Sequence, residues 1–97
     1  MAEIDKNDSS IYIGNKPFIN YITAVVMQFT TKQVDEVIVK ARGKFISRAV
    51  DVALVSSKRF LQDSVDITNI AIDSQEFKNK EGRDVRVSTI EIKLHKK

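Results

Sequence analysis

The feature that most limits how this chain can fold is a change of hydrophobic pattern around Gly43. Before it, Val37, Ile38 and Val39 form a continuous apolar run, which predicts a strand over residues 34–41 that is buried on both faces in a central position. After it, apolar residues recur at helical spacing, namely Ile46, Ala49, Val50, Ala53 and Leu54. Glycine lets the chain bend between the two patterns. We therefore predict a strand, a tight turn and a helix that ends near Lys58 or Phe60.

This turn is strongly basic. Residues 40–48 contain four cations and no acidic residue, and the cations are Lys40, Arg42, Lys44 and Arg48. The formal net charge of the whole chain is only +3, so this one segment carries its entire positive excess. The start of a helix also presents unpaired backbone N–H groups and a partial positive charge, which attract anions. The segment is typical of a phosphate-binding turn, and the alternative is a solvated turn that keeps the protein in solution.

The length and pattern of the chain predict one domain. Residues 1–10 are polar and are interpreted as a flexible N-terminal arm, whereas residues 11–97 form a single domain. A strand at 11–13 precedes a helix that begins near Pro17, and two further strands at 65–72 and 85–94 follow the second helix. Phase shifts within these last strands suggest bulges or a second buried face. Residues 79–82 predict the hairpin turn between them, with Gly82 available for positive φ.

The predicted order is β-α-β-α-β-β. It indicates a two-layer α/β (α+β) fold, with a four-stranded mixed sheet, two helices on one face and a long hairpin arm formed by the last two strands. If the first three strands are parallel, both helices begin at the same edge of the sheet. The segment Gly14, Asn15 and Lys16 would then lie beside the basic turn, and together they would form a site for a polyanion.

The hairpin arm adds weaker evidence, because its charge is mixed. Its cations are Lys78, Lys80, Arg83 and Arg86, and they face the acidic residues Glu76, Glu81 and Asp84. An ordinary solvated hairpin is the alternative interpretation. Three apolar residues near the second helix fall partly off its apolar stripe, namely Phe45, Val52 and Phe60, and they suggest either a partner surface or a broad core face. Asp51 could pair with Arg48 or meet a partner chain.

Residues for catalysis are scarce. The chain has no cysteine, and its single histidine, His95, lies in the C-terminal tail. The carboxylates are scattered, and Gly43-Lys44 is followed by Phe45 rather than Ser or Thr, so there is no P-loop. We expect no enzymatic activity, no metal and no cofactor. A polar N-terminus and the lack of a long apolar run predict an intracellular protein with no membrane partner.

The chain resembles the Alba family of archaeal chromatin proteins over about residues 11–97. The resemblance is carried by Ile13-Gly14-Asn15-Lys16-Pro17, Asn20-Tyr21, Lys40-Ala41-Arg42-Gly43-Lys44, Ile46-Ser47-Arg48-Ala49-Val50-Asp51, Arg59-Phe60-Leu61 and Arg86-Val87-Ser88-Thr89-Ile90-Glu91-Ile92. It implies a cytoplasmic, chromosome-associated homodimer that coats duplex DNA with little sequence preference and also binds RNA.

The resemblance also implies roles for individual residues. By position, the side chains that would contact the backbone of the nucleic acid are those of Lys16, Lys40, Arg42 and Lys44. The N–H of Gly43 would be a further hydrogen-bond donor. Arm contacts map to Lys78, Lys80, Arg83 and Arg86, and Phe60, next to Arg59, would join dimers side by side.

One departure from the family pattern is Asn15. At this position close relatives often carry a lysine that is acetylated, and a sirtuin-type deacetylase reverses that acetylation. Regulation by acetylation is therefore in doubt, although Lys16 could be a substitute target.

Two other functions stay open at this point. One is an RNA-binding subunit of an RNA-processing particle such as ribonuclease P, and the other is a protein-interaction module that oligomerises through the second helix. Base stacking on single strands is disfavoured, because there is no aromatic platform and Tyr12 and Tyr21 are interpreted as structural residues.

Overall fold

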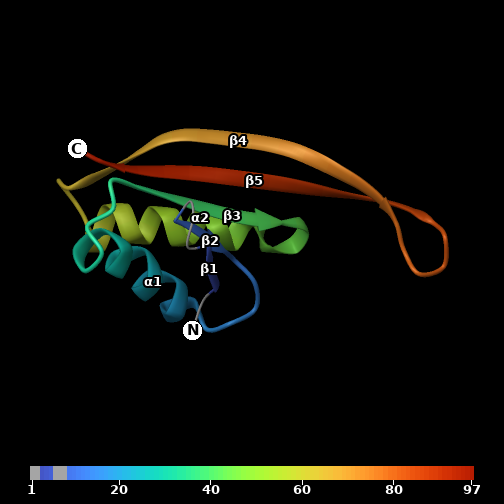
Figure 1. The fold of residues 1–97 in the computed structure, drawn as a ribbon, viewed down its shortest axis with the longest axis horizontal. Coiled ribbons are helices and arrows are strands. Elements are labelled where there is room, and N and C mark those ends of the chain that lie inside the picture. Colours follow the sequence, from blue (N-terminus) through green and yellow to red (C-terminus); the bar gives the residue numbers. More distant parts are fainter. Residues whose placement is uncertain (1–2, 6–8) are drawn as a thin grey trace.

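The computed structural model describes residues 3–5 and 9–97, with side chains from residue 9 onward. Two helices, α1 (Phe18–Thr30) and α2 (Ile46–Val55), lie on one face of a mixed sheet (Figure 1). A 3₁₀ turn, Gly43–Phe45, precedes α2, and a π-helical turn, Ser56–Phe60, extends it. The strands are β1 (Glu3–Asp5), β2 (Ser10–Tyr12), β3 (Glu36–Arg42), β4 (Val65–Lys78) and β5 (Asp84–Lys96).

The sheet has the order β1-β2-β3-β5-β4. Strand β2 is parallel to β3, whereas β5 is antiparallel to both β3 and β4. Strands β2, β3 and β4 therefore run in one direction, and both helices start at the same edge of the sheet. The predicted fold, a four-stranded mixed sheet with two helices on one face, is confirmed.

A fifth short strand, β1, pairs antiparallel with β2 at the edge of the sheet. It lies within the segment 1–10 that was interpreted from the sequence as a flexible arm, and residues 1–2 and 6–8 of that segment lie outside the described residues.

The core lies between the sheet and the two helices. Alternate residues of β3, namely Val37, Val39 and Ala41, are buried on the helix side, whereas Ile38 between them is only partly buried. The prediction that this strand is buried on both faces is therefore wrong, because no helix covers the second face of the sheet among the described residues (Figure 1).

Helix α2 presents most of the predicted face to the core, because Ala49 and Ala53 are buried and Ile46 and Val50 are partly buried against the core. Its buried residues are Ala49, Val52 and Ala53, and Ser56 continues them, whereas Leu54 is 39% exposed. The buried face is thus turned toward Val52 and Ser56 and away from Leu54. Val52 is fully buried, so its assignment to a partner surface is wrong.

Strands β4 and β5 extend away from the body as a hairpin arm (Figure 1). At its turn, the side-chain oxygen of Asn79 accepts hydrogen bonds from the N–H groups of Glu81 and Arg83 at 2.9 and 3.0 Å, and Gly82 has φ +78°. The predicted hairpin turn is confirmed. The pairing register shifts between Ile67 and Asn69, which confirms a bulge at the predicted phase shift. Across residues 3–5 and 9–97, no helix has the length and apolarity needed to cross a bilayer.

Gly43 connects β3 to the 3₁₀ turn with φ +58°, and a Cβ atom there would lie 3.3 Å from Cγ2 of Val87. We expect Gly43→Ala to lower the free energy of unfolding by about 1–2 kcal/mol, because an L side chain is disfavoured in this conformation. Urea unfolding at a fixed protein concentration measures this. Gly14→Ala is the control, since its Cβ would make only an ordinary contact, 3.5 Å from the Tyr21 hydroxyl. Equal stability of the two variants would contradict the prediction.

Candidate nucleic-acid interface

The loop between β2 and α1 lies beside the end of β3. The backbone N–H of Ile13 donates to the carbonyl oxygen of Lys40 at 2.8 Å, which continues the parallel pairing of the two strands by one residue. The loop segment from Gly14 to Lys16 therefore begins next to the point where the chain enters the basic turn. This is the juxtaposition that the parallel arrangement of the strands predicted.

Tyr21, on the first turns of α1, holds this loop in place. Its ring is buried, with 2% of the residue exposed, and its hydroxyl oxygen accepts hydrogen bonds from the N–H groups of Gly14 at 2.9 Å and Lys16 at 3.0 Å. These two backbone N–H groups, which would otherwise donate to water, thus share the Tyr21 hydroxyl oxygen as their acceptor. The structural interpretation of Tyr21 agrees with this geometry.

Arg48 joins the loop to the second helix. Its Nη2 donates to the carbonyl oxygen of Lys16 at 2.7 Å, and its guanidinium lies 5.7 Å from the centre of the Tyr21 ring. Its Nε is buried and has no hydrogen-bond partner among the described residues. Arg48 is therefore engaged in holding two chain segments together, and direct binding of a phosphate by this residue stays a prediction.

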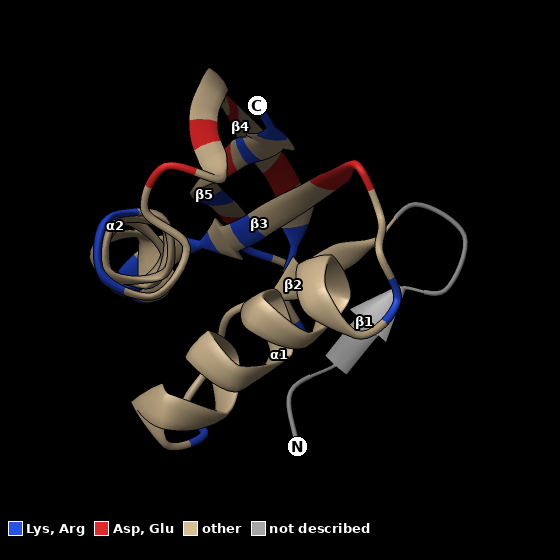
Figure 2. Cartoon of the chain, turned by 90° about the vertical axis from the view of Figure 1, so that its left-hand side faces the viewer, with Lys and Arg blue, Asp and Glu red and all other residues tan. Residues whose placement is uncertain are grey.

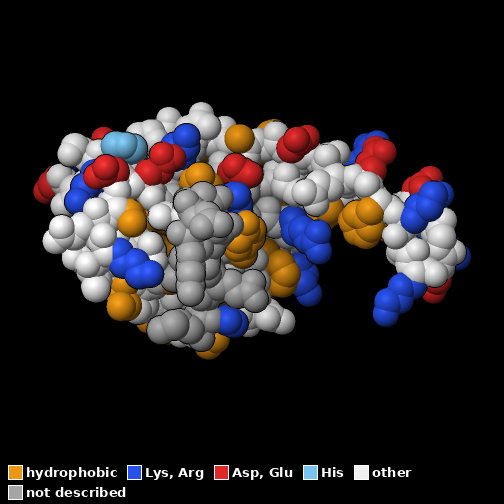
Figure 3. Space-filling model, viewed as in Figure 1, with side chains coloured by type: hydrophobic (Ala, Val, Ile, Leu, Met, Phe, Trp, Pro, Cys, Tyr) orange, Lys and Arg blue, Asp and Glu red, His pale blue; other side chains and the backbone are white. Residues whose placement is uncertain are grey.

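The other predicted contact residues surround this junction. Asn15, Lys16, Arg42, Gly43 and Lys44 are exposed, and Lys40 is partly buried. Lys and Arg lie on β3, on α2 and on the 3₁₀ and π-helical turns at the two ends of α2, whereas α1 has no charged residue (Figure 2). Further Lys and Arg side chains lie at the inner angle between body and arm (Figure 3). The structure thus brings the two predicted basic turns together at one edge of the sheet.

The ammonium groups of two lysines lie over aromatic rings in this region. Nζ of Lys40 is 5.5 Å from the centre of the Tyr12 ring, and Nζ of Lys44 is 5.3 Å from that of Phe45. In the register of the sheet, Tyr12 is directly opposite Lys40. The side chains of Tyr12 and Lys40 therefore lie on the face of the sheet that the helices leave open.

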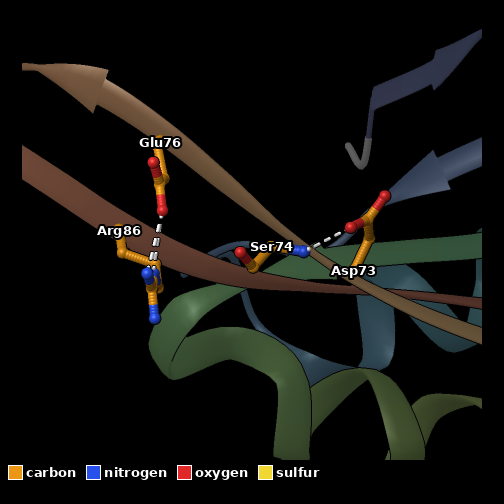
Figure 4. Close-up of polar contacts among 4 residues, drawn as sticks. All are labelled: Asp73, Ser74, Glu76 and Arg86. Atoms are coloured by element: carbon orange, nitrogen blue, oxygen red, sulfur yellow. Dashed lines mark hydrogen bonds and ion pairs between the residues drawn. The ribbon is translucent and has the colours of Figure 1, made fainter.

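Most cations of the arm are paired with acidic residues. Arg86 contacts Oε1 of Glu76 through Nη2 and Nε at 2.9 and 3.2 Å (Figure 4), Lys78 lies 3.3 Å from Asp84, and Arg83 lies 3.9 Å from Glu81. Such exposed pairs contribute little stability. Lys80, at the tip, forms no ion pair with a described residue. Contact of these four residues with nucleic acid stays a prediction.

The residues predicted for contacts between chains are on the surface. Asp51, Arg59 and Phe60 are exposed, and within the described chain Asp51 forms no ion pair with Arg48. Phe60 is 56% exposed and borders a small hollow of about 140 Å³ beside Ile19 and Met27, which are also exposed. This apolar patch is suited to a contact with another chain.

A second apolar surface was missed by the sequence analysis. Ile70 and Ile72 on β4 are 59% and 79% exposed, although they pair with Ile92 and Ile90, whose side chains are buried on the helix side of the sheet. Leu54 is exposed on α2, which covers that side. The phase shift at Asn69 was a signal, because the bulge keeps Ile70 and Ile72 on the same face as Ile67. The pattern alone does not show where the coverage of the sheet by α2 ends.

The comparisons with known proteins agree with this geometry. The family model named Alba matches residues 9–74, which include the loop, the basic turn and most of β4. This chain belongs to the Alba family. The DNA/RNA-binding protein Alba of Nanoarchaeum equitans is 54% identical over 88 residues, 90% of this chain and 97% of the relative.

Two further Alba proteins extend the match. That of Methanococcus maripaludis, also named a DNA/RNA-binding protein, is 47% identical over 89 residues, 92% of this chain and 99% of the relative. The structure of Alba from Thermoplasma volcanium superimposes with a TM-score of 0.80 at 41% identity, and covers 89% of this chain and 98% of that one. The resemblance to the Alba family is confirmed, and the match extends through most of the fold.

Removing the Tyr21 hydroxyl tests the hydrogen bonds that hold the loop. We expect Tyr21→Phe to lower the free energy of unfolding by about 1–3 kcal/mol, because two partly buried N–H groups lose their acceptor. Thermal or urea unfolding measures the change. Tyr12→Phe is the matched control, since Tyr12 is 43% exposed. A loss of stability no larger than that of the control would show that the hydroxyl does not hold the loop.

Proposed function

We propose that this Alba protein binds DNA and RNA without catalysis, through contacts to the phosphate backbone and with little sequence preference. The observation that carries the proposal is the junction at which Arg48 ties the Lys16 loop to the start of the second helix, so that two basic turns form one surface. Relatives at 47% and 54% identity are named DNA/RNA-binding proteins, and they support the same role for this chain.

The chemistry of the surface favours phosphate. Lys16, Arg42 and Lys44 are exposed at this edge, and their side chains can only donate hydrogen bonds. Contacts of this kind position a protein on the nucleic acid but carry no sequence information. Binding would therefore release counterions and weaken steeply with salt.

The apolar surface formed by Leu54, Ile70 and Ile72 supports a homodimer. Strand β4 is at the edge of the sheet, and apolar side chains this exposed on an edge strand are rare in a monomer. We propose that a second copy of this chain covers the surface, because a two-fold dimer buries the same surface on both chains at once. The dimer would carry two basic junctions and two arms, so it could follow the backbone of a duplex.

Coating of DNA is the larger-scale consequence that we propose. The apolar patch of Ile19, Met27 and Phe60 would join dimers side by side on the duplex, in the cytoplasm on the chromosome. The RNA-processing role remains an outcome of the binding experiment below.

The first experiment is a salt titration of binding to random-sequence duplex DNA and to a structured RNA of equal length. If roughly four to six cations per dimer engage phosphates, log affinity should fall with log salt at a slope of about −4 to −5 on DNA. Arg42→Ala should weaken binding to every sequence alike and flatten the slope by about one unit for each phosphate that is no longer neutralised.

Lys58→Ala is the control, because Lys58 is an exposed cation in the π-helical turn at the opposite end of the second helix. Unchanged affinity and slope in Arg42→Ala would contradict the proposed site. A much tighter, less salt-dependent binding of RNA would instead indicate a role in RNA processing.

A charge placed in the β4 surface tests the dimer. We expect Ile72→Glu to convert the protein from dimer to monomer, because the carboxylate would be buried against the partner without a counter-charge. Sedimentation velocity measures the mass. Ile19→Glu, at a residue that is 58% exposed on α1, is the control and should leave the dimer intact. A wild-type monomer, or a dimeric Ile72→Glu variant, would exclude this interface.

A further inference from the structure

Tyr12 is placed unlike a structural tyrosine. Its side chain is on the open face of the sheet and is 43% exposed, whereas Tyr21 is buried with 2% exposed. The structural interpretation of Tyr12 made from the sequence therefore does not match its environment. An exposed aromatic ring beside cations is a surface on which a base can stack.

Tyr12 lines two hollows. One, of about 420 Å³, is lined also by Lys40, Arg42, Gln75, Thr89 and Glu91. The other, of about 240 Å³, is lined also by Gly14, Asn15 and Lys16. Cations that the proposed function assigns to phosphate binding thus line both of the hollows that Tyr12 borders. Phe60, which is also exposed, borders a hollow of almost wholly apolar residues.

The larger hollow is suited to a base rather than to a phosphate. The Glu91 carboxylate lines it and would repel a phosphate group, but it can accept a hydrogen bond from the exocyclic amine of a base. The Gln75 amide and the Thr89 hydroxyl add a donor and an acceptor each. Lys16, which lines the smaller hollow, and Arg42, which lines the larger one, can hold the flanking phosphates.

We infer that Tyr12 forms a stacking site for an unpaired base of single-stranded nucleic acid. This inference rests on the proposed function and adds a ligand class to it. In a duplex the bases are stacked on one another and cannot reach the ring, whereas the bases of a single strand can turn outward and stack on an aromatic side chain. The backbone-binding residues are shared by both ligands, and Tyr12 is specific to the single strand.

The test compares binding of a short oligodeoxycytidylate with binding of a duplex of the same length. Tyr12→Leu should weaken single-strand binding roughly 5- to 100-fold, because the base no longer has a ring to stack on, and should leave duplex binding unchanged. Tyr12→Phe keeps the ring and should retain single-strand binding. Phe77→Leu is the matched control, since Phe77 is 45% exposed on the arm, and it should bind both ligands like the wild type. Unfolding curves establish that each variant is folded.

Fluorescence gives an independent measurement. The chain has two tyrosines and no tryptophan, and the other tyrosine is buried, so quenching of tyrosine emission by the single strand reports on Tyr12. The quenching should disappear in Tyr12→Phe.

Three outcomes would overturn the inference. The first is single-strand binding by Tyr12→Leu that equals the wild type, and the second is an equal loss of single-strand and duplex binding, which would make Tyr12 a general backbone contact. The third is a wild-type protein that binds duplex but no single strand, and this outcome would leave the proposed function intact. Failure of the wild type to bind either ligand would refute both proposals.

Discussion

The geometry of this protein depends on the hydrogen bond from Arg48 to the carbonyl oxygen of Lys16. It joins the loop that precedes the first helix to the helix that follows the basic turn, 32 residues later in the chain. Tyr21 completes the junction, because its hydroxyl receives two N–H groups of the same loop and its ring lies under the guanidinium. One buried tyrosine and one half-buried arginine thus fix the position of one basic segment relative to the other. Two solvated loops without these contacts would not be held in this way.

The two faces of the sheet serve different purposes. The helix side contains the core, and at β4 it continues into exposed isoleucines that no described residue covers. The open side contains Tyr12, Lys40 and the residues of the larger hollow. Charge is modest overall, at +3, so the affinity for a polyanion must come from concentrating cations at one edge. The acidic residues of the arm offset the charge of its cations, so the arm attracts a polyanion less strongly than the body does.

Much of the fold could be predicted from local pattern. The change of period at Gly43, the crossover rule and the glycine-containing turn at Gly82 depend on nearby residues and on chain handedness, and the structure agrees with each of them. The rotation of α2 could not be predicted in the same way. Val52 and Leu54 are both apolar and two residues apart, yet Val52 is fully buried and Leu54 is 39% exposed, and this difference depends on which elements pack against the helix.

The amino-acid sequence alone predicted the order of strands and helices, the family, and a basic turn where a strand meets a helix. They follow from periodicity, steric limits of the backbone and charge along the chain, which are local properties. The folded chain was needed to show that Arg48 holds the loop, that Ile70 and Ile72 are exposed, and that Tyr12 borders two hollows. Those properties could not be predicted locally, because burial and hydrogen bonding depend on contacts between residues that are distant in the chain.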